Sequence, residues 1–282
     1  MNTLVGHLRL PNSYLRMHTG VNAKFVIAGG ATFNTSSFYD MGTGAEVVFT
    51  NTPASQKIYD DANTTGWLTW SVAGNRYLQY NGDRNRGMRN HVRTTVNGAF
   101  ASDSYFYFGG TGLLDLCGTT QSISRIEALT KSASDWTPAA SGVITSAAPA
   151  KLTFNWGNTY TNSAIFTGAV SLEQAGAGTV YLTAASASTG DLIATAGRIS
   201  LWPSAKWIGR IVLNGGVVAV PGASAFGADS SLSVGGGMIE LPAGEYSFVS
   251  VTDAEGNPVA PGRYAATASA GVQAAEWIAG EN

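Results

Sequence analysis

Glycine recurs at nearly constant spacing in the second half of the chain, and this period limits the possible folds more than any other feature. Gly178, Gly197, Gly216 and Gly237 follow one another at nearly equal intervals, and each begins a Gly-x-apolar-x-apolar pattern. Such alternation is typical of a strand that buries one face. A strand that returns about every 20 residues predicts a solenoid, in which successive coils stack on each other.

The alternation also predicts which side chains fill the core of this solenoid. The residues that alternate with these inward-facing side chains, such as Tyr181, Ser200 and Glu240, are expected on the outer face. No segment of ten or more residues keeps the apolar period of a helix, so helix should be nearly absent. The residues predicted to point inward are Leu152, Phe154, Val170, Leu172, Val180, Leu182, Leu192, Ala194, Ile199, Leu201, Ile211, Leu213, Val218, Val220, Leu232, Val234, Ile239 and Leu241.

The turn signals suggest one long β domain with a distinct segment at each end. From Ala23 onward, short β-branched or aromatic runs alternate with Gly-Gly and Asn-Gly turns. The expected parts are an entering segment or the remnant of a preceding coil at 1–22, a parallel β-helix at 23–242 with a loop excursion at about 130–150, and a C-terminal β cap at 243–282.

The cap is expected because the open end of a solenoid is a sheet edge that needs a cover. Tyr246, Phe248 and Trp277 are the large apolar residues of this segment that we predict to close the core. A hairpin or a pair of strands is expected around Asp253–Pro261, where EGNP marks a turn. The loop excursion should carry one short strand at GVIT, residues 142–145.

Residues 171–201, SLEQAGAGTVYLTAASASTGDLIATAGRISL, resemble the autotransporter-associated β-strand repeat of bacterial surface and secreted proteins. Similar outlying pieces are LLDLCGTTQSI at 113–123 and the C-terminal GNPVAPGRYAAT. The sequence departs from the repeat at Glu173-Gln174 and Ser186–Ser188, which we expect to face solvent. The positions that carry the resemblance are Gly176, Gly178, Val180, Leu182, Thr189, Gly190, Ala196, Gly197, Ile199 and Leu201.

This resemblance implies a single-stranded right-handed parallel β-helix and an exported location, extracellular or at the bacterial outer surface, with the signal segment outside this chain. It implies no particular activity, because such repeats serve as a scaffold and function lies in sites added to it.

Composition agrees with an extracellular β protein. Only 12% of the residues are charged, about half the usual share, and 35 are glycine. The net charge of −2 gives no long-range field that would attract nucleic acid, and no apolar run is long enough for a membrane span. The one cysteine, Cys117, excludes an internal disulfide, and its apolar strand context favours a buried thiol over a reactive one.

The one concentrated group of charges is NGDRNRGMRNHVR, at residues 81–93. Arginine pairs bidentately with carboxylates, so this cluster is a candidate contact for an anionic glycan. The alternatives are a solvated turn between coils or a polysaccharide-lyase site, for which no acidic residues recur at the coil period. The candidate ligand-binding residues are Asp83, Arg84, Arg86, Arg89 and Arg93.

We therefore expect an exported bacterial scaffold or adhesin-like stalk that displays loops or fused domains at the cell surface, and not an enzyme. The alternative is a carbohydrate-active β-helix that binds or cleaves an anionic polysaccharide, and a third is an assembly module that stacks coil edges. No catalytic residue, cofactor or metal site is predicted. The expected partners are a polysaccharide or cell-surface glycan and the other domains of a longer chain.

Overall fold

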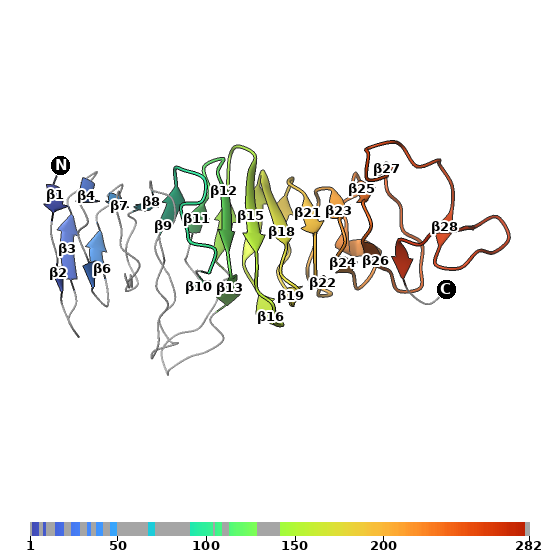
Figure 1. The fold of residues 1–282 in the computed structure, drawn as a ribbon, viewed down its shortest axis with the longest axis horizontal. Helices are drawn as coiled ribbons and strands as arrows, with labels where there is room; N and C mark the ends of the chain where they lie inside the picture. Colours follow the sequence, from blue (N-terminus) through green and yellow to red (C-terminus); the bar gives the residue numbers. More distant parts are fainter. Residues whose placement is uncertain are drawn as a thin grey trace. The chain divides into compact units, whose positions relative to one another are not determined.

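In a computed structural model the chain is an all-β parallel β-helix, whose short strands stack coil upon coil (Figure 1). The structure describes residues 91–103, 105–108, 113–128 and 142–279, and only the strands before residue 91. Among these residues the single helical element is one 3-10 turn, η1 (Ala223–Ala225). The chain forms two compact units, Met1–Lys151 and Leu152–Asn282.

The first unit is built on one parallel sheet in the order β1-β4-β7-β8-β9-β11-β14. Because β1 already pairs with β4, strand pairing starts before residue 23. These strands are β1 (Asn2–Val5), β4 (Lys24–Ala28), β7 (Glu46–Phe49), β8 (Trp67–Trp70), β9 (His91–Thr94), β11 (Leu113–Asp115) and β14 (Val143–Thr145).

The length of the coils varies in this sheet. One line of register partners shows the variation, because the intervals between its members are unequal and the last of them, from Asp115 to Thr145, is the longest. The predicted loop excursion falls within that last interval. The line runs Thr3–Val26–Val48–Thr69–Arg93–Asp115–Thr145.

The expected strand at 142–145 is confirmed as β14. Residues 129–141, the larger part of the predicted excursion, lie outside the described residues. Three further parallel pairs are β2-β5, β3-β6 and β10-β13. The remaining strands of this part are β2 (Leu8–Arg9), β3 (Leu15–Thr19), β5 (Phe33–Asn34), β6 (Phe38–Met41), β10 (Tyr105–Phe108), β12 (Thr120–Ile123), β13 (Arg125–Ala128) and β15 (Ala150–Phe154), which spans the unit boundary.

The second unit contains two long parallel sheets, β18-β21-β23-β25-β27 and β16-β19-β22-β24-β26-β30. Two smaller pairs, β17-β20 and β28-β29, are also parallel. The strands are β16 (Tyr160–Asn162), β17 (Ile165–Gly168), β18 (Val170–Gln174), β19 (Thr179–Leu182), β20 (Ala187–Ser188), β21 (Leu192–Ala194), β22 (Arg198–Leu201), β23 (Ile211–Leu213), β24 (Val217–Ala219), β25 (Leu232–Val234), β26 (Met238–Glu240), β27 (Val251–Thr252), β28 (Tyr264–Ala265), β29 (Gln273–Ala274) and β30 (Ile278–Ala279).

Equivalent residues of successive coils lie side by side in these two sheets. The register runs Leu172–Leu192–Ile211–Leu232 in one sheet, and their N–H groups donate to carbonyl oxygens of the next coil at 2.8–3.0 Å. The other sheet aligns Val180, Ile199, Val218 and Ile239. All eight side chains are buried, so each column of aliphatic residues continues the core from one coil to the next.

The predicted inward residues are buried with two exceptions, Val234 and Leu241, which are partly exposed. The largest fully buried side chain is Trp207, whose Nε1 donates to the carbonyl oxygen of Gly190 at 2.8 Å. Its ring lies 5.5 Å from that of Phe166. An indole can lie this deep because its one donor has a partner.

The expectation that Glu173-Gln174 and Ser186–Ser188 face solvent is met only in part, since Glu173 is partly exposed and Ala187 is exposed. Gln174 and Ser188 are fully buried and Ser186 nearly so, although these positions were predicted to face solvent. The Gln174 amide donates to the Gly176 carbonyl at 2.7 Å, and the Ser186 hydroxyl accepts the Phe166 N–H at 3.1 Å. Polar side chains are therefore needed inside, where the chain bends and leaves backbone groups without strand partners.

Cys117 is exposed rather than buried. It lies in a tight turn closed by the Thr119 N–H and the Leu116 carbonyl at 2.8 Å. Cys117 has φ +46° and Gly118 has φ +76°, and the backbone N–H of Cys117 donates to the Asp115 carboxylate at 2.9 Å. The chain thus turns one residue earlier than the apolar run LLDLC suggests.

Candidate functional site

The predicted anionic-glycan cluster falls mostly on residues that the structure does not describe. Asp83, Arg84, Arg86 and Arg89 lie outside the described residues. Arg93 lies in β9, between the buried Val92 and Thr94, so its side chain alternates to the outer face. Its register partner in the next strand is Asp115, which places a carboxylate on the same face and works against binding an anion there. The glycan contact at 81–93 stays a prediction.

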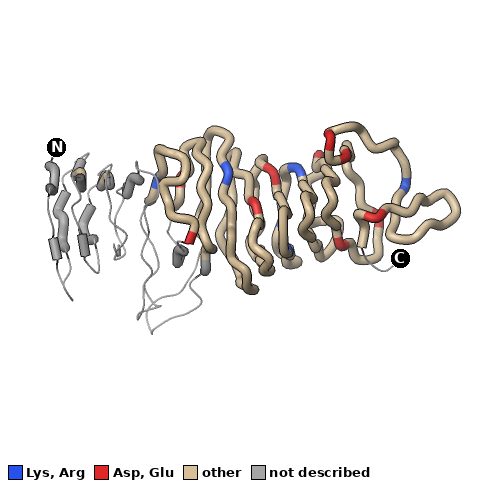
Figure 2. The backbone as a smooth tube through the Cα atoms, in the orientation of Figure 1, with Lys and Arg blue, Asp and Glu red and all other residues tan. Residues whose placement is uncertain are grey.

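Among the described residues, no group of three or more His, Cys, Asp or Glu side chains is placed to hold a metal ion. No helix among those residues is long and apolar enough to span a membrane. Charged residues are sparse along most of the described backbone, and acidic ones gather near the C-terminal loops, as Figure 2 shows.

The candidate site is at the end of the second unit, where the chain leaves the regular coil after β27 and rejoins it at β30. We call residues 253–277 the C-terminal excursion; its wide loops are drawn in orange-red in Figure 1. It begins with a turn in which the Asp253 carboxylate accepts the N–H groups of Glu255 and Asn257, at 3.1 and 2.7 Å. An antiparallel bridge between Thr252 and Pro258 closes this turn, which confirms the expected hairpin.

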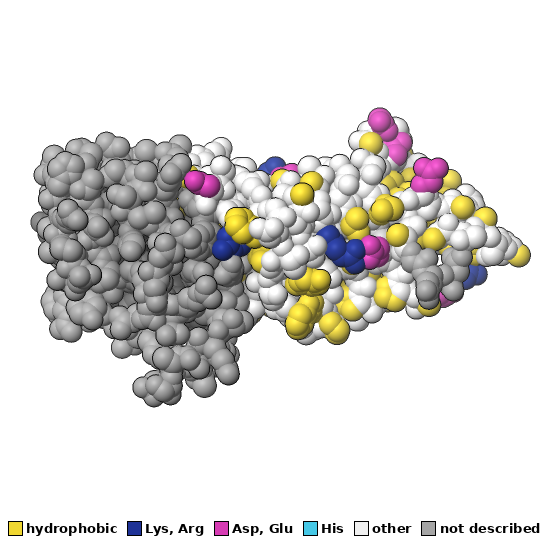
Figure 3. Space-filling view, turned by 60° about the horizontal axis from the view of Figure 1, so that its bottom comes forward, with side chains coloured by type: hydrophobic (Ala, Val, Ile, Leu, Met, Phe, Trp, Pro, Cys, Tyr) yellow, Lys and Arg dark blue, Asp and Glu magenta, His cyan; other side chains and the backbone are white. Residues whose placement is uncertain are grey.

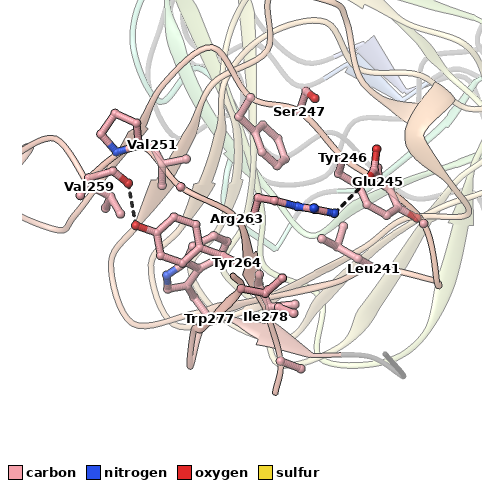
Figure 4. A pocket seen from close by; sticks show the side chains of 18 of the residues that line it. Leu241, Glu245, Tyr246, Ser247, Val251, Val259, Arg263, Tyr264, Trp277 and Ile278 are labelled. Atoms are coloured by element: carbon pink, nitrogen blue, oxygen red, sulfur yellow. Dashed lines mark hydrogen bonds and ion pairs between the residues drawn. The ribbon is translucent and has the colours of Figure 1, made fainter. Parts of the chain in front are cut away.

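A cavity of about 870 Å³ lies between this excursion and residues 241–251 (Figure 4). We call it the C-terminal cavity. One wall carries Tyr246 and Phe248, whose rings lie 6.4 and 5.2 Å from that of the buried Phe226. Another wall carries Tyr264 and Trp277, with ring centroids 5.8 Å apart. All four of these rings are partly exposed, so flat apolar surface faces the cavity from two sides.

An ion pair lies between the two walls. Figure 4 shows the Arg263 side chain extended toward Glu245, and its guanidinium donates to that carboxylate at 2.9 Å. The two side chains are 71% and 88% exposed, so the pair contributes little to stability and stays accessible to a ligand. Partial burial raises the pKa of Tyr246 above its ordinary value, so its phenol remains neutral at physiological pH.

The sequence prediction for this segment is met only in part. Tyr246 and Phe248 do contact Phe226 at the end of the stack, whereas Trp277 contacts Tyr264. Tyr264 is not among the residues predicted to close the core; it follows the turn signal Pro261-Gly262. Whether residues 243–282 act as a cap stays a prediction.

Half-exposed rings around a solvent-accessible hollow, with one donor and one acceptor at its mouth, can bind a ligand that has both apolar faces and hydroxyl groups. The residues that line the cavity do not form an acid–base pair of the kind that hydrolysis requires, since their one carboxylate, that of Glu245, is paired with Arg263.

In comparisons with known proteins, no family model, no curated protein and no solved structure matches this chain.

Proposed function

We propose that this chain is a β-helical scaffold of an exported bacterial protein, an adhesin-like stalk that displays loops or fused domains at the cell surface. Support comes from the parallel β-helix and from residues 171–201, which resemble the autotransporter-associated repeat of such proteins. A stack whose strands pair only with those of adjacent coils can carry an insertion in one coil without rearranging the rest.

The observation that carries this proposal is the unequal length of the coils in the second unit. Val180, Ile199 and Val218 are successive register partners at equal intervals, which define the regular coil. The interval from Ile239 to its partner Ile278 is about twice as long as this regular coil. The additional residues are held out from the stack, and most of them are exposed.

The outer surface of the stack fits a display role. On the part of the face that Figure 3 colours by type, hydrophobic and charged side chains form small separate patches among neutral side chains and backbone. Few of the large apolar residues described are strongly exposed; these are Trp202, Met238 and Val249. Such a surface keeps a stalk soluble without committing its sides to a partner.

Surface display can be tested on intact cells of the bacterium that produces the protein. An antibody against the peptide 253–277 should label intact cells, and external protease should remove the signal without cleaving a cytosolic marker. The fragment left after cleavage should retain the β-helix, because the stacked strands are protected and the excursion is exposed. Labelling that appears only after lysis would contradict the proposal.

A further inference from the structure

We propose that the C-terminal cavity is a binding site for a neutral, hydroxyl-rich carbohydrate. This goes beyond the scaffold role, and binding by the purified chain does not depend on where the protein is located. A failed binding experiment and a failed surface-labelling experiment are therefore distinguishable.

The C-terminal cavity has the size and the lining of a ligand site. Its volume of about 870 Å³ falls in the range of ~300–1,000 Å³ that ligand pockets occupy. The hollow is open to solvent between exposed loops, so a ligand could enter it without unpacking the core. Ser247, Ser250 and Ser269 add hydroxyl groups to its lining.

Aromatic rings line the cavity on two sides. Tyr264 and Trp277 form one ring surface, tilted by 47°, while Tyr246 and Phe248 form the other around Phe226. The C–H face of a sugar ring is flat and apolar, and it packs on aromatic rings without leaving a polar group unpaired. Two ring surfaces that line one cavity suit a chain of sugars better than an isolated small polar molecule.

The charges at the mouth select against ionic ligands. Arg263 and Glu245 are 2.9 Å apart and neutralise each other. Because the two charges cancel, the pair gives no net attraction for a uronate carboxylate or for an ammonium group. Neighbouring sugar hydroxyls match the pair, because one can accept a hydrogen bond from the guanidinium while another donates to the carboxylate.

The wall that carries Tyr264 is held in place before any ligand arrives. The Tyr264 hydroxyl donates to the Ala260 carbonyl oxygen at 2.6 Å, and its backbone pairs with Gln273 in β28-β29. Asn257 donates to the Asp253 carboxylate and lowers the pKa of Asp253, so this turn keeps its charged acceptor at physiological pH. A prearranged wall loses less conformational entropy on binding.

The experiment is a titration of the full chain with cellohexaose, laminarihexaose, mannohexaose and xylohexaose. Binding is measured by calorimetry and by saturation-transfer NMR. At least one neutral oligosaccharide should bind with a dissociation constant below ~1 mM. Trp277→Ala should weaken binding about fivefold, since a ring contact contributes about 1 kcal/mol. Trp202→Ala is the matched control, since Trp202 is 47% exposed and does not line the cavity, and it should leave binding unchanged.

Arg263→Ala provides a second test that does not disturb the aromatic walls. It should weaken binding of the neutral sugars, while both variants keep the β-sheet circular dichroism of the wild type. Polygalacturonate forms the anionic arm of the panel, with formation of unsaturated uronate followed by absorbance. Binding of polygalacturonate alone, or neutral-sugar binding unchanged by both variants, would overturn the proposal. The proposal would also fail if no neutral sugar bound; self-association in sedimentation that Trp277→Ala abolished would then identify a second copy as the occupant.

Discussion

Gly197 lies directly against the carbonyl oxygen of Gly178 in the neighbouring coil. A Cβ atom at Gly197 would come closer than 3.0 Å to this oxygen, and the following N–H, that of Arg198, donates to the same oxygen at 3.0 Å. Gly197 also has φ +57°, a conformation in which side chains are strained. The glycine period visible in the sequence is thus a column in which two coils approach too closely for any side chain.

Gly209→Ala tests steric exclusion alone, because Gly209 lacks a positive φ but faces the backbone of Gly190. We expect a loss of roughly 1–3 kcal/mol in the free energy of unfolding, as for overpacked cores. Gly197→Ala should cost about 1 kcal/mol more, since it adds backbone strain. Gly157→Ala is the control, because nothing lies within 4 Å of its Cβ position. Equal urea midpoints for Gly209→Ala and Gly157→Ala would contradict the close approach.

Gln174→Glu tests the buried amide. The Gln174 Oε1 atom is buried with no hydrogen-bond donor, so a carboxylate there would be neither solvated nor paired. The pKa of the introduced carboxyl should rise in the folded state, above about 4.3 for an exposed glutamate. Below pH ~4 the variant should therefore be about as stable as the wild type, and its free energy of unfolding should fall below that of the wild type as the pH rises. Gln273→Glu, at an exposed position, should show no such trend in urea unfolding.

Arg198 and Glu240 form an ion pair across two coils, with side chains 35% and 37% exposed. The hydrogen bonds to Glu240 raise the pKa of Arg198. A double-mutant cycle with Arg198→Ala and Glu240→Ala should give a coupling of about 0.5–1 kcal/mol that decreases with added salt. The same cycle on the far more exposed Arg263–Glu245 pair is the control and should give about 0.2 kcal/mol or less. Similar couplings would show that exposure does not set their strength.

Cys117 should react slowly with alkylating agents even though it is exposed. Partial desolvation, the negative charge of Asp115 and a hydrogen bond to Asp115 raise its pKa to about 11. Asp115→Asn should lower this pKa and accelerate iodoacetamide labelling at pH 8, about tenfold per pKa unit. Asp103→Asn is the control in the same unit. A labelling rate unaffected by Asp115→Asn would mean that the carboxylate does not act on the thiol.

Truncation after Pro242 tests the predicted cap. It removes β27 and β30, which pair with β25 and β26, and the rings that contact Phe226. Two sheet edges and an aromatic side chain would then face solvent, so we expect concentration-dependent association in sedimentation experiments. A monomeric fragment with a cooperative melt would show that residues 243–282 are not needed as a cap.

Much of the fold could be predicted from the sequence because the core repeats. Strand alternation identified Leu172, Leu192, Ile211 and Leu232 as inward, and they form one buried column. In the first unit the intervals between register partners are unequal, so no fixed period was visible there. Gln174 follows the alternation of β18 despite its polarity, and points inward with Val170 and Leu172.

Local alternation and turn chemistry are enough to predict the parallel stacking, the glycine-marked period and, for the described residues, the near absence of helix. The folded structure alone decides that Tyr246 and Phe248 pack on Phe226 while Tyr264 pairs with Trp277. It also decides that Arg263 reaches Glu245 across the C-terminal cavity. These contacts join residues of an irregular excursion, where no repeat relates one position to the next, so their partners are set by packing in three dimensions.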